Sequence, residues 1–448
     1  LEREGARGTS AARVAWHLER ARDPEGAARR YAEAGDAARR IHSAGEALRL
    51  FDRALALLPA ADLRRFEVLE RREKVAKDLG LVAERGEHVE EMLGIARGLD
   101  DPRTLARAEN RRAQLEYDRG RFREAAAHLS AALERGGAAR CPATQVESLR
   151  LLAYVAAEHG HLVRALDCCE RALAIVPPGE EERYLTGRVQ NAKGLVLLML
   201  GHLDEAPPVL AEALVLFRRI GKRRNESTVL SNMALVAQAR GELVEGLHLL
   251  ESAVRIDRQV RDVSARGRKL AAMGGIRVEL GDFVGAREAL EEARHICREN
   301  AEPVGEVEAE LGLAELHLGV GEAARAREIL AGPNHRAFVA RSRILTVRHH
   351  QLSAEAARDL GEPARARAAV DEAARIAFGA GMNGELVHAR VRRALLAAEA
   401  GRPGEAMVAV RRAEELVADV GGVRRAEQVW WLAALAAHRA GSPLSAAA

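Results

Sequence analysis

The chain has 448 residues, of which 48% are hydrophobic, 3% are aromatic and 30% are charged, and its formal net charge is +3. So few aromatic residues exclude a large β-sandwich or barrel, because strands favour aromatic and β-branched side chains. The apolar share is too high for a chain that stays unfolded, and no apolar run approaches the roughly 18 residues of a membrane-spanning helix. We therefore expect an all-α protein with no membrane role.

Residues 1–100 show an irregular helical pattern and are predicted to form N-terminal helical repeats. Within them, one set of small, aromatic and proline residues follows a regular spacing: Gly35, Ala47, Phe51, Ala54 and Pro59. Residues 60–100, when counted from Gly86, have Glu91 and Gly98 where alanines are expected. We interpret that stretch as a degenerate repeat.

Residues 101–448 contain glycines that recur every 40 or 41 residues: Gly120, Gly160, Gly201, Gly241, Gly281, Gly321, Gly361, Gly401 and Gly441. Seven residues before and five residues after each of these glycines, the sequence has Ala or Gly. Apolar residues between them recur at three and four, which is typical of amphipathic helices. The pattern predicts regular repeats of helix A, glycine turn and helix B, with the last repeat truncated and small side chains where the helices cross.

Prolines mark both regular and irregular helix starts. Pro363 and Pro403 follow their glycines by two residues, where the first turn of a helix tolerates proline. Pro207-Pro208 and Pro333 interrupt the pattern of small residues and helices. We expect local irregularities at both places.

The small residues at fixed offsets resemble the tetratricopeptide repeat, whose period is usually about 34 residues. The resemblance implies a right-handed α-solenoid, or superhelix, in which longer helices or loops absorb the additional residues. It also implies that ligands bind on the concave face, which the A helices line.

The opening segment AWHLERARDPEGAARRYAEAGDAAR resembles the junction that precedes the tetratricopeptide sensor of bacterial STAND-type signal-transduction ATPases, which include maltose-regulator-like activators and kinase or cyclase fusions. The resemblance is carried by His17, Leu18, Asp23, Ala27, Tyr31, Ala34, Gly35 and Asp36. It implies that the chain is a fragment of a longer cytoplasmic signalling protein. The chain has no Gly-x-x-x-x-Gly-Lys-Ser/Thr phosphate loop, so we expect any ATPase to lie outside it.

The resemblance places the inward positions of helix A thirteen, ten, six and three residues before each turn glycine. These offsets select the candidate protein- or peptide-binding residues Arg107, Asn110, Gln114, Tyr117, Arg150, Tyr154, Arg188, Asn191, Ser231, Gln238 and Arg268. Asparagine can bind backbone amides, and the arginine fork suits carboxylates. A polar stripe is also what the solvent-facing side of any repeat needs, so both interpretations stay open.

Farther along, the same offsets select apolar residues: Leu311, Leu318, Val391, Leu395, Trp431 and Leu435. They predict either binding of a hydrophobic segment or self-association through the C-terminal repeats. For Trp430-Trp431, packing is favoured over a role as an anchor for a partner.

The sequence offers no pattern typical of catalysis, cofactor binding or metal binding. Cys141, Cys168, Cys169 and Cys297 are too few for a disulfide framework and favour a reducing compartment. His349-His350 are adjacent on a helix and point about 100° apart, which does not suit a shared metal. We expect neither an enzyme nor a nucleic-acid reader, since no base-reading side chain recurs at one offset.

We interpret the sequence as a protein- or peptide-binding module that serves as the sensor or partner-recruitment part of a larger bacterial signalling protein. The ligand could also be a small inducer. A peptide-pheromone receptor-like repeat protein and a pure assembly scaffold are the alternatives that the sequence leaves open.

Overall fold

The computed structural model describes residues 2–41, 43–79, 81–179, 181–300, 302–332, 342–420, 433 and 435. Every regular element in these ranges is an α-helix, and none of these residues lies in a strand. The chain divides into two compact units, residues 1–151 with 259–264 and residues 152–258 with 265–448. The all-α prediction is confirmed.

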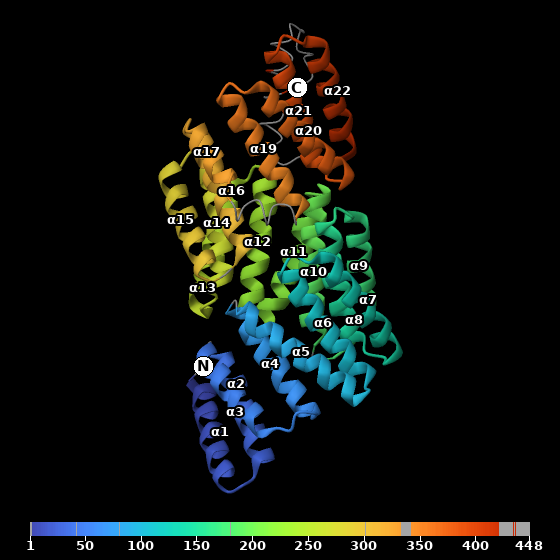
Figure 1. Cartoon of the computed structure of the whole chain (residues 1–448), viewed down its shortest axis with the longest axis vertical. Helices are drawn as coiled ribbons and strands as arrows, with labels where there is room; N and C mark the ends of the chain where they lie inside the picture. The colour runs from blue at the N-terminus through green and yellow to red at the C-terminus, as the bar shows by residue number, and fades with distance from the viewer. Residues whose placement is uncertain are drawn as a thin grey trace. The chain divides into compact units, whose positions relative to one another are not determined.

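The first unit is a succession of helical hairpins, coloured blue to teal in Figure 1. Its helices are α1 (Glu2–Arg20), α2 (Pro24–Arg40), α3 (Ala44–Leu57), α4 (Leu63–Asp78), α5 (Val82–Leu99), α6 (Pro102–Asp118), α7 (Phe122–Ala138) and the first part of α8 (Pro142–Glu158). From α1 to α7, each helix packs against the next. Phe51 and Phe66 are completely buried in the core between them.

The second unit continues the same pattern from the end of α8. Its helices are α9 (Leu162–Ala174), α10 (Glu182–Leu200), α11 (Ala206–Arg219), α12 (Arg223–Ala239), α13 (Leu243–Val260), α14 (Val263–Glu279), α15 (Phe283–Glu299), α16 (Pro303–Gly319), α17 (Ala323–Leu330), α19 (Arg343–Asp359), α20 (Pro363–Gly379), α21 (Asn383–Glu399) and α22 (Pro403–Val420). Residues 259–264, at the junction of α13 and α14, are grouped with the first unit. The A helices, which end before a turn glycine, are α6, α8, α10, α12, α14, α16, α19 and α21.

The turn glycines have the conformation that the repeat pattern predicts. Those from Gly120 to Gly401 have φ between 70° and 86°, a left-handed region that favours glycine at the end of a helix. At the helix crossings, a Cβ atom on Gly194 would lie 2.5 Å from the Leu210 side chain. The predicted role of small residues is therefore confirmed there, while Gly441 lies outside the described residues.

Two sequence expectations about irregular repeats have different outcomes. Residues 60–100 form an ordinary hairpin of α4 and α5, and Gly86 lies inside α5 rather than in a turn, so counting offsets from Gly86 was wrong. The irregularity at Pro207-Pro208 is confirmed, because α11 begins only at Ala206 after additional turn residues. Pro333 lies outside the described residues.

Three of the apolar candidates in the later repeats belong to the core. Leu311, Val391 and Leu395 are 0%, 1% and 2% exposed and belong to buried clusters formed with the following helices. They do not form an exposed apolar wall, because their positions on helix A point towards helix B. Leu318 and Leu435 pack against the same cores, and Trp430-Trp431 lie outside the described residues. Self-association through these repeats stays a prediction.

Candidate functional site

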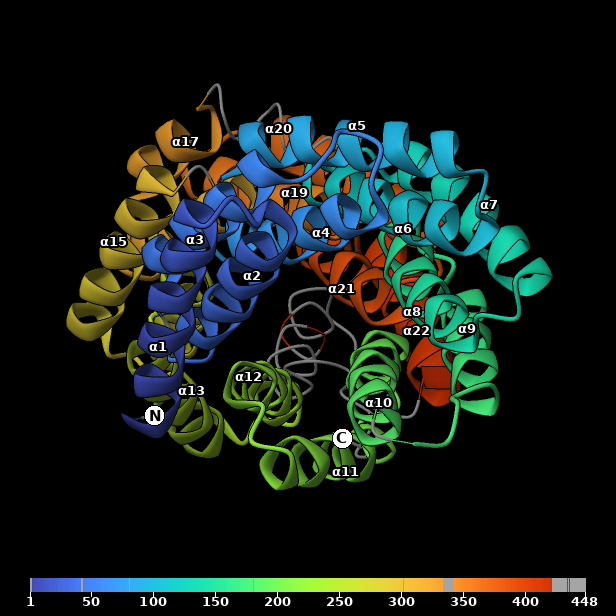
Figure 2. The ribbon, with the colours of Figure 1, turned by 90° about the horizontal axis from the view of Figure 1, so that it is seen from below.

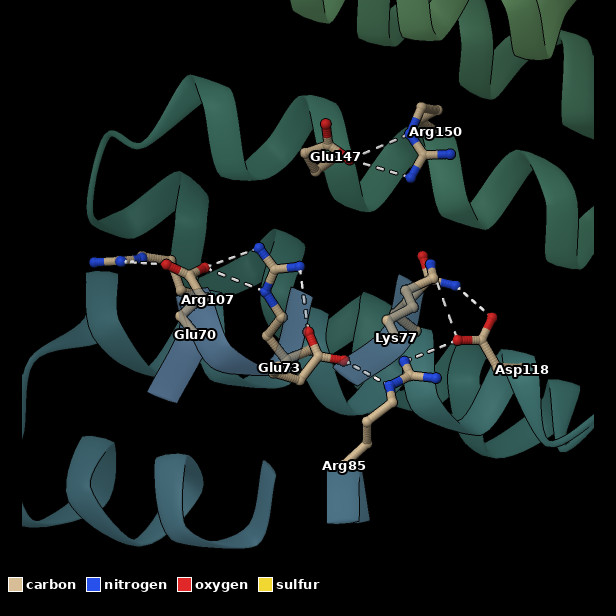
Figure 3. Close-up of polar contacts among 10 residues, drawn as sticks. Glu70, Glu73, Lys77, Arg85, Arg107, Asp118, Glu147 and Arg150 are labelled. Carbon is tan, nitrogen blue, oxygen red and sulfur yellow. Dashed lines mark hydrogen bonds and ion pairs between the residues drawn. The ribbon is translucent and has the colours of Figure 1, made fainter. Parts of the chain in front are cut away.

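Helices α4, α5 and α6 of the first unit carry a layer of ion pairs, shown in Figure 3. Glu70 and Glu73 lie one turn apart on α4, and Arg107 and Arg111 lie one turn apart on α6. The Arg107 Nη2 donates to Glu70 Oε2 at 2.6 Å, and the Arg111 Nη2 donates to Glu70 Oε1 at 3.0 Å. The Arg111 Nη1 lies 3.8 Å from Glu73 Oε2. We call these residues, with Lys77, Arg85 and Asp118, the charged layer.

Arg85 extends the charged layer from α5 to the end of α6. Its Nε donates to Glu73 Oε1 at 2.9 Å, and its Nη2 lies 2.8 Å from Asp118 Oδ2. The side chains of Arg85 and Glu73 are 3% and 0% exposed. Removing two charges from water is expensive, so each depends on the other for compensation.

Neighbouring positive charges keep Glu70 of the charged layer ionised. Burial alone would raise the pKa of Glu70, but Arg111, Lys74 and Arg107 outweigh it and hold that pKa well below its usual range. Burial disfavours the charge of Arg111, yet Glu70 and Glu73 keep the Arg111 pKa raised. Glu70 and Arg111 therefore stabilise each other in their charged forms.

The candidate binding residues of the first unit are engaged by the protein itself. Asn110 Nδ2 donates to the Thr144 backbone oxygen at 3.0 Å, and Asn110 Oδ1 accepts from the Ser148 hydroxyl at 2.7 Å, which ties α6 to α8. The remaining candidates here have these partners: Arg107 with Glu70, Gln114 with Asp118, Arg150 with Glu147, and the Tyr117 ring with Phe122. A ligand at this surface must compete with these contacts.

The second unit contains the other six candidates. Tyr154, Arg188 and Ser231 are half-buried, Asn191 and Gln238 are buried, and Arg268 is exposed. The Arg188 guanidinium lies 5.5 Å from the centroid of the Tyr184 ring, one turn earlier on α10. Gln238 Nε2 donates to Glu279 across α12 and α14. The structure thus brings Arg188 and Asn191 together on one face of α10.

Two asparagines join the A helices α10 and α12, which lie side by side on the same side of α11 in Figure 2. Asn232 Nδ2 donates to Asn191 Oδ1 at 2.9 Å. Within the described part of the chain, Asn191 Nδ2 and Asn232 Oδ1 have no hydrogen-bond partner, and both atoms keep contact with solvent. We call these two residues the amide pair, which presents one donor group and one acceptor.

Sequence reasoning missed Asn232 and most of the charged layer. Asn232 follows Asn191 by nearly one repeat, but it lies one position away from the offset used for the inward residues. Glu73 and Arg85 were missed because residues 60–100 were interpreted as a degenerate repeat, which hid the hairpin that joins them. A search for polar residues spaced by one repeat would have found the amide pair.

Along the described ranges, the side chains and helices offer little to other kinds of site. No group of three or more His, Cys, Asp or Glu side chains there is placed to hold a metal ion. None of the described helices combines the length and the apolarity needed to cross a membrane. Burial raises the pKa of the Cys297 thiol to about 12, which disfavours the reactive thiolate.

No family model and no curated protein match the sequence. Among solved structures, a Rap protein complexed with competence and sporulation factor is 16% identical, with a TM-score of 0.59 over 79% of this chain and 98% of that one. A chain of the APC/C hetero-tetramer Cut9-Hcn1 is 13% identical, with a TM-score of 0.55 over 97% of this chain and 84% of that one. The Rap conjugation gene regulator of plasmid pLS20, in complex with the Phr* peptide, is 14% identical, with a TM-score of 0.52 over 77% and 95%. At these identities the likeness concerns the fold, and it confirms the tetratricopeptide-like α-solenoid.

Proposed function

We propose that this chain is a peptide- or protein-binding module and that the amide pair of the second unit contacts the backbone of its ligand. An extended peptide exposes one N–H and one C=O per residue, and each needs a partner when it leaves water. Asn191 Nδ2 can donate to a ligand carbonyl while Asn232 Oδ1 accepts from a ligand N–H. This unused hydrogen-bonding capacity is the observation that carries the proposal.

The mutual hydrogen bond of the amide pair prepares it for binding. It fixes both side chains before a ligand arrives, so less side-chain entropy is lost on association. Side-chain amides also bind a peptide backbone without reading its side chains. Selectivity must therefore come from neighbouring groups.

Arg188 and Lys222 place positive charge on the Tyr184 ring, about two turns before Asn191 on α10. The Arg188 guanidinium and the Lys222 ammonium lie 5.5 and 5.6 Å from the centroid of the same Tyr184 ring. Arg188 precedes Asn191 by three residues, so the two share a face of α10. We therefore favour an extended ligand that carries an acidic group at this end.

The wider role that we propose is that of a sensor or partner-recruitment region in a larger bacterial signalling protein. The peptide-bound Rap structures support a peptide ligand over a pure scaffold, as proteins of the same fold. The resemblance of the opening segment to the ATPase junction supports the larger context. Sequencing the full reading frame tests that context, because a preceding ATPase, kinase or cyclase module is expected.

The binding proposal is tested by selecting ligands from a displayed library of random peptides against the full chain. Enriched peptides are then measured against the Asn191→Ala, Asn232→Ala and Arg188→Ala variants. Each asparagine variant should weaken binding by about five- to tenfold, which corresponds to the loss of one hydrogen bond of about 1 kcal/mol. Arg188→Ala should weaken acidic peptides selectively.

Gln190→Ala is the matched control, because Gln190 lies next to Asn191 but its amide donates to Glu212 on α11 at 2.8 Å. It should leave peptide affinity unchanged. Enriched peptides that bind the asparagine variants as tightly as the wild type would place the ligand elsewhere.

A further inference from the structure

Two turns of the second unit that are far apart in the sequence meet backbone to backbone. Gly160 lies in the α8–α9 turn, and Ala380 lies in the α20–α21 turn. A Cβ atom built on Gly160 would lie 2.3 Å from the Ala380 Cβ and 2.4 Å from the Ala380 carbonyl oxygen. A Cβ atom on Gly381 would lie 3.5 Å from the Gly160 carbonyl oxygen. Only a residue without a side chain allows this approach at position 160.

The solvent exposure of the two turns agrees with this contact. Gly160 is buried, whereas five other turn glycines are exposed: Gly241, Gly281, Gly321, Gly361 and Gly401. A Cβ atom on any of these five would meet no described atom within 4 Å. Ala380 is 1% exposed, while Ala139, which also follows the last residue of a helix B, is half-buried. Both sides of the contact are thus withdrawn from solvent.

The helices between the two turns follow one another around the second unit. Helix α10 packs against α11 and α12, α15 packs against α16, and α19 packs against α20. Figure 2 shows this succession passing once around, from α8 and α9 through α10, α13 and α15 to α17, with α21 and α22 back on the side of α8 and α9. The α8–α9 and α20–α21 turns therefore belong to successive windings of the unit.

The contact joins the two ends of one winding. In a solenoid, each hairpin contacts its neighbours, and small rotations between hairpins add up along the chain. The hairpins from α9 to α20 can therefore change the spacing of the windings without unfolding. A contact between the ends of the winding acts on the sum of these rotations.

Such a contact resists approach much more than separation. Atoms in contact attract one another weakly, but they repel steeply when they come closer. Here the facing atoms belong to the backbone of Gly160 and to the backbone and methyl group of Ala380. These atoms cannot move aside as the end of a long side chain can.

We propose that the contact between the α8–α9 and α20–α21 turns is a stop that sets the shortest pitch of the second unit. Its windings can separate but cannot approach further, so the unit behaves as a spring that can be stretched and not compressed. Helices α10 and α12 lie within the winding that the stop limits. This winding responds to a force or a ligand only by lengthening. The inference does not depend on the proposed peptide binding.

The test measures distances between spin labels on the full chain by double electron–electron resonance. The labels replace Val163 on α9 and Phe378 on α20, which are 77% and 72% exposed. They are introduced as Val163→Cys and Phe378→Cys in a Cys141→Ala background, because the other native cysteines are buried. Without further substitution, the distance distribution should end sharply on its short side, and urea below the unfolding transition should add longer distances only. Equal broadening towards shorter and longer distances would overturn the stop.

Gly160→Asn tests the contact itself, and Gly361→Asn is its matched control. The two glycines have φ of 75° and 72°, a region that asparagine tolerates better than most residues. Since carbon atoms in contact lie about 3.5–4.0 Å apart, Gly160→Asn should lengthen the mean label distance by more than about 1 Å. Gly361→Asn should leave the distance unchanged. Equal distances in the two variants would overturn the contact.

A second label pair distinguishes separated windings from a general loosening of the unit. Val244→Cys and Val284→Cys place labels near the starts of α13 and α15, at residues that are 60% and 74% exposed. Their distance should be the same with and without Gly160→Asn. A change as large as that of the first pair would overturn the stop. If Gly160→Asn does not fold, the response of the unsubstituted turn to urea decides the proposal.

Discussion

The two units present A-helix surfaces that are similarly polar but differ in how their polar groups are paired. In the first unit, Arg111 of the charged layer pairs with both Glu70 and Glu73. The Asn110 side chain hydrogen-bonds to Thr144 and Ser148. In the second unit, Asn191 and Asn232 share one hydrogen bond, and the Asn191 Nδ2 and the Asn232 Oδ1 have no further partner among the described residues. The first surface is saturated by internal contacts, whereas the second keeps the hydrogen-bonding groups on which the proposed binding depends.

The position of a residue within the repeat does not by itself make it a candidate for binding. Asn110 and Asn191 both stand ten residues before their turn glycines. Asn110 meets a backbone carbonyl and a serine on the next A helix, whereas Asn191 meets a second asparagine. The residue that faces each asparagine decides between a structural and a binding role.

The largest expected loss of stability comes from removing a buried charge from the first surface. Glu73→Ala leaves the buried Arg85 without one of its two acidic partners and should lower the free energy of unfolding by about 3–5 kcal/mol. Urea unfolding followed by circular dichroism measures the loss. Glu67→Ala on the same helix is the control, because its pair with Arg71 is largely exposed and should contribute at most about 1 kcal/mol. Similar losses in the two variants would contradict a structural role for the layer.

The pH dependence of stability tests whether Glu70 acts through its charge. The pKa of Glu70 is lowered in the folded chain, so its stabilisation is present above its ordinary pKa and is lost as the pH falls. Glu70→Gln should cost about 2 kcal/mol at pH 7, as expected for hydrogen bonds to a charged group, and progressively less as the pH falls below the ordinary carboxyl value of about 4.3. Urea midpoints of wild type and variant across this pH range provide the measurement. A constant difference would show that Glu70 does not act through its charge.

The smallest expected changes in stability and peptide affinity are those of the Asn110→Ala and Asn191→Ala variants. Asn110→Ala removes two hydrogen bonds between α6 and α8 and should lower the free energy of unfolding by about 1–2 kcal/mol. It should leave the affinity of selected peptides unchanged. Asn191→Ala should have the reverse profile, with weaker binding and a smaller loss of stability. Thermal unfolding and peptide titration of both variants provide the comparison, and matching profiles would remove the distinction between the surfaces.

Much of the fold could be predicted because its determinants are local. The left-handed turn at Gly201 and the close crossing of Gly194 with Leu210 follow from backbone sterics, which the sequence displays directly. The late start of α11 followed from Pro207-Pro208 in the same way. The hairpin of α4 and α5 was misjudged because Gly86 resembles a turn residue but lies within a helix.

The binding surface was harder to predict because it depends on pairs of residues from different repeats. The inward offsets located Asn191, but its partner Asn232 lies one position away in the next repeat. The same offsets selected Leu311, which packs into the core. A single offset cannot separate the solvent-facing side of helix A from the side that faces helix B, since a small rotation of the helix exchanges them.

The even spacing of the left-handed turn glycines has a consequence for how such a gene can change. Unequal crossover between the codons of any two of them adds or deletes whole hairpins and leaves every helix intact. An added or deleted hairpin between Gly160 and Ala380 would separate the α8–α9 turn from the α20–α21 turn, whose backbones lie in contact at these two residues. Selection for their contact would therefore hold the number of hairpins constant between them, while the number elsewhere could vary.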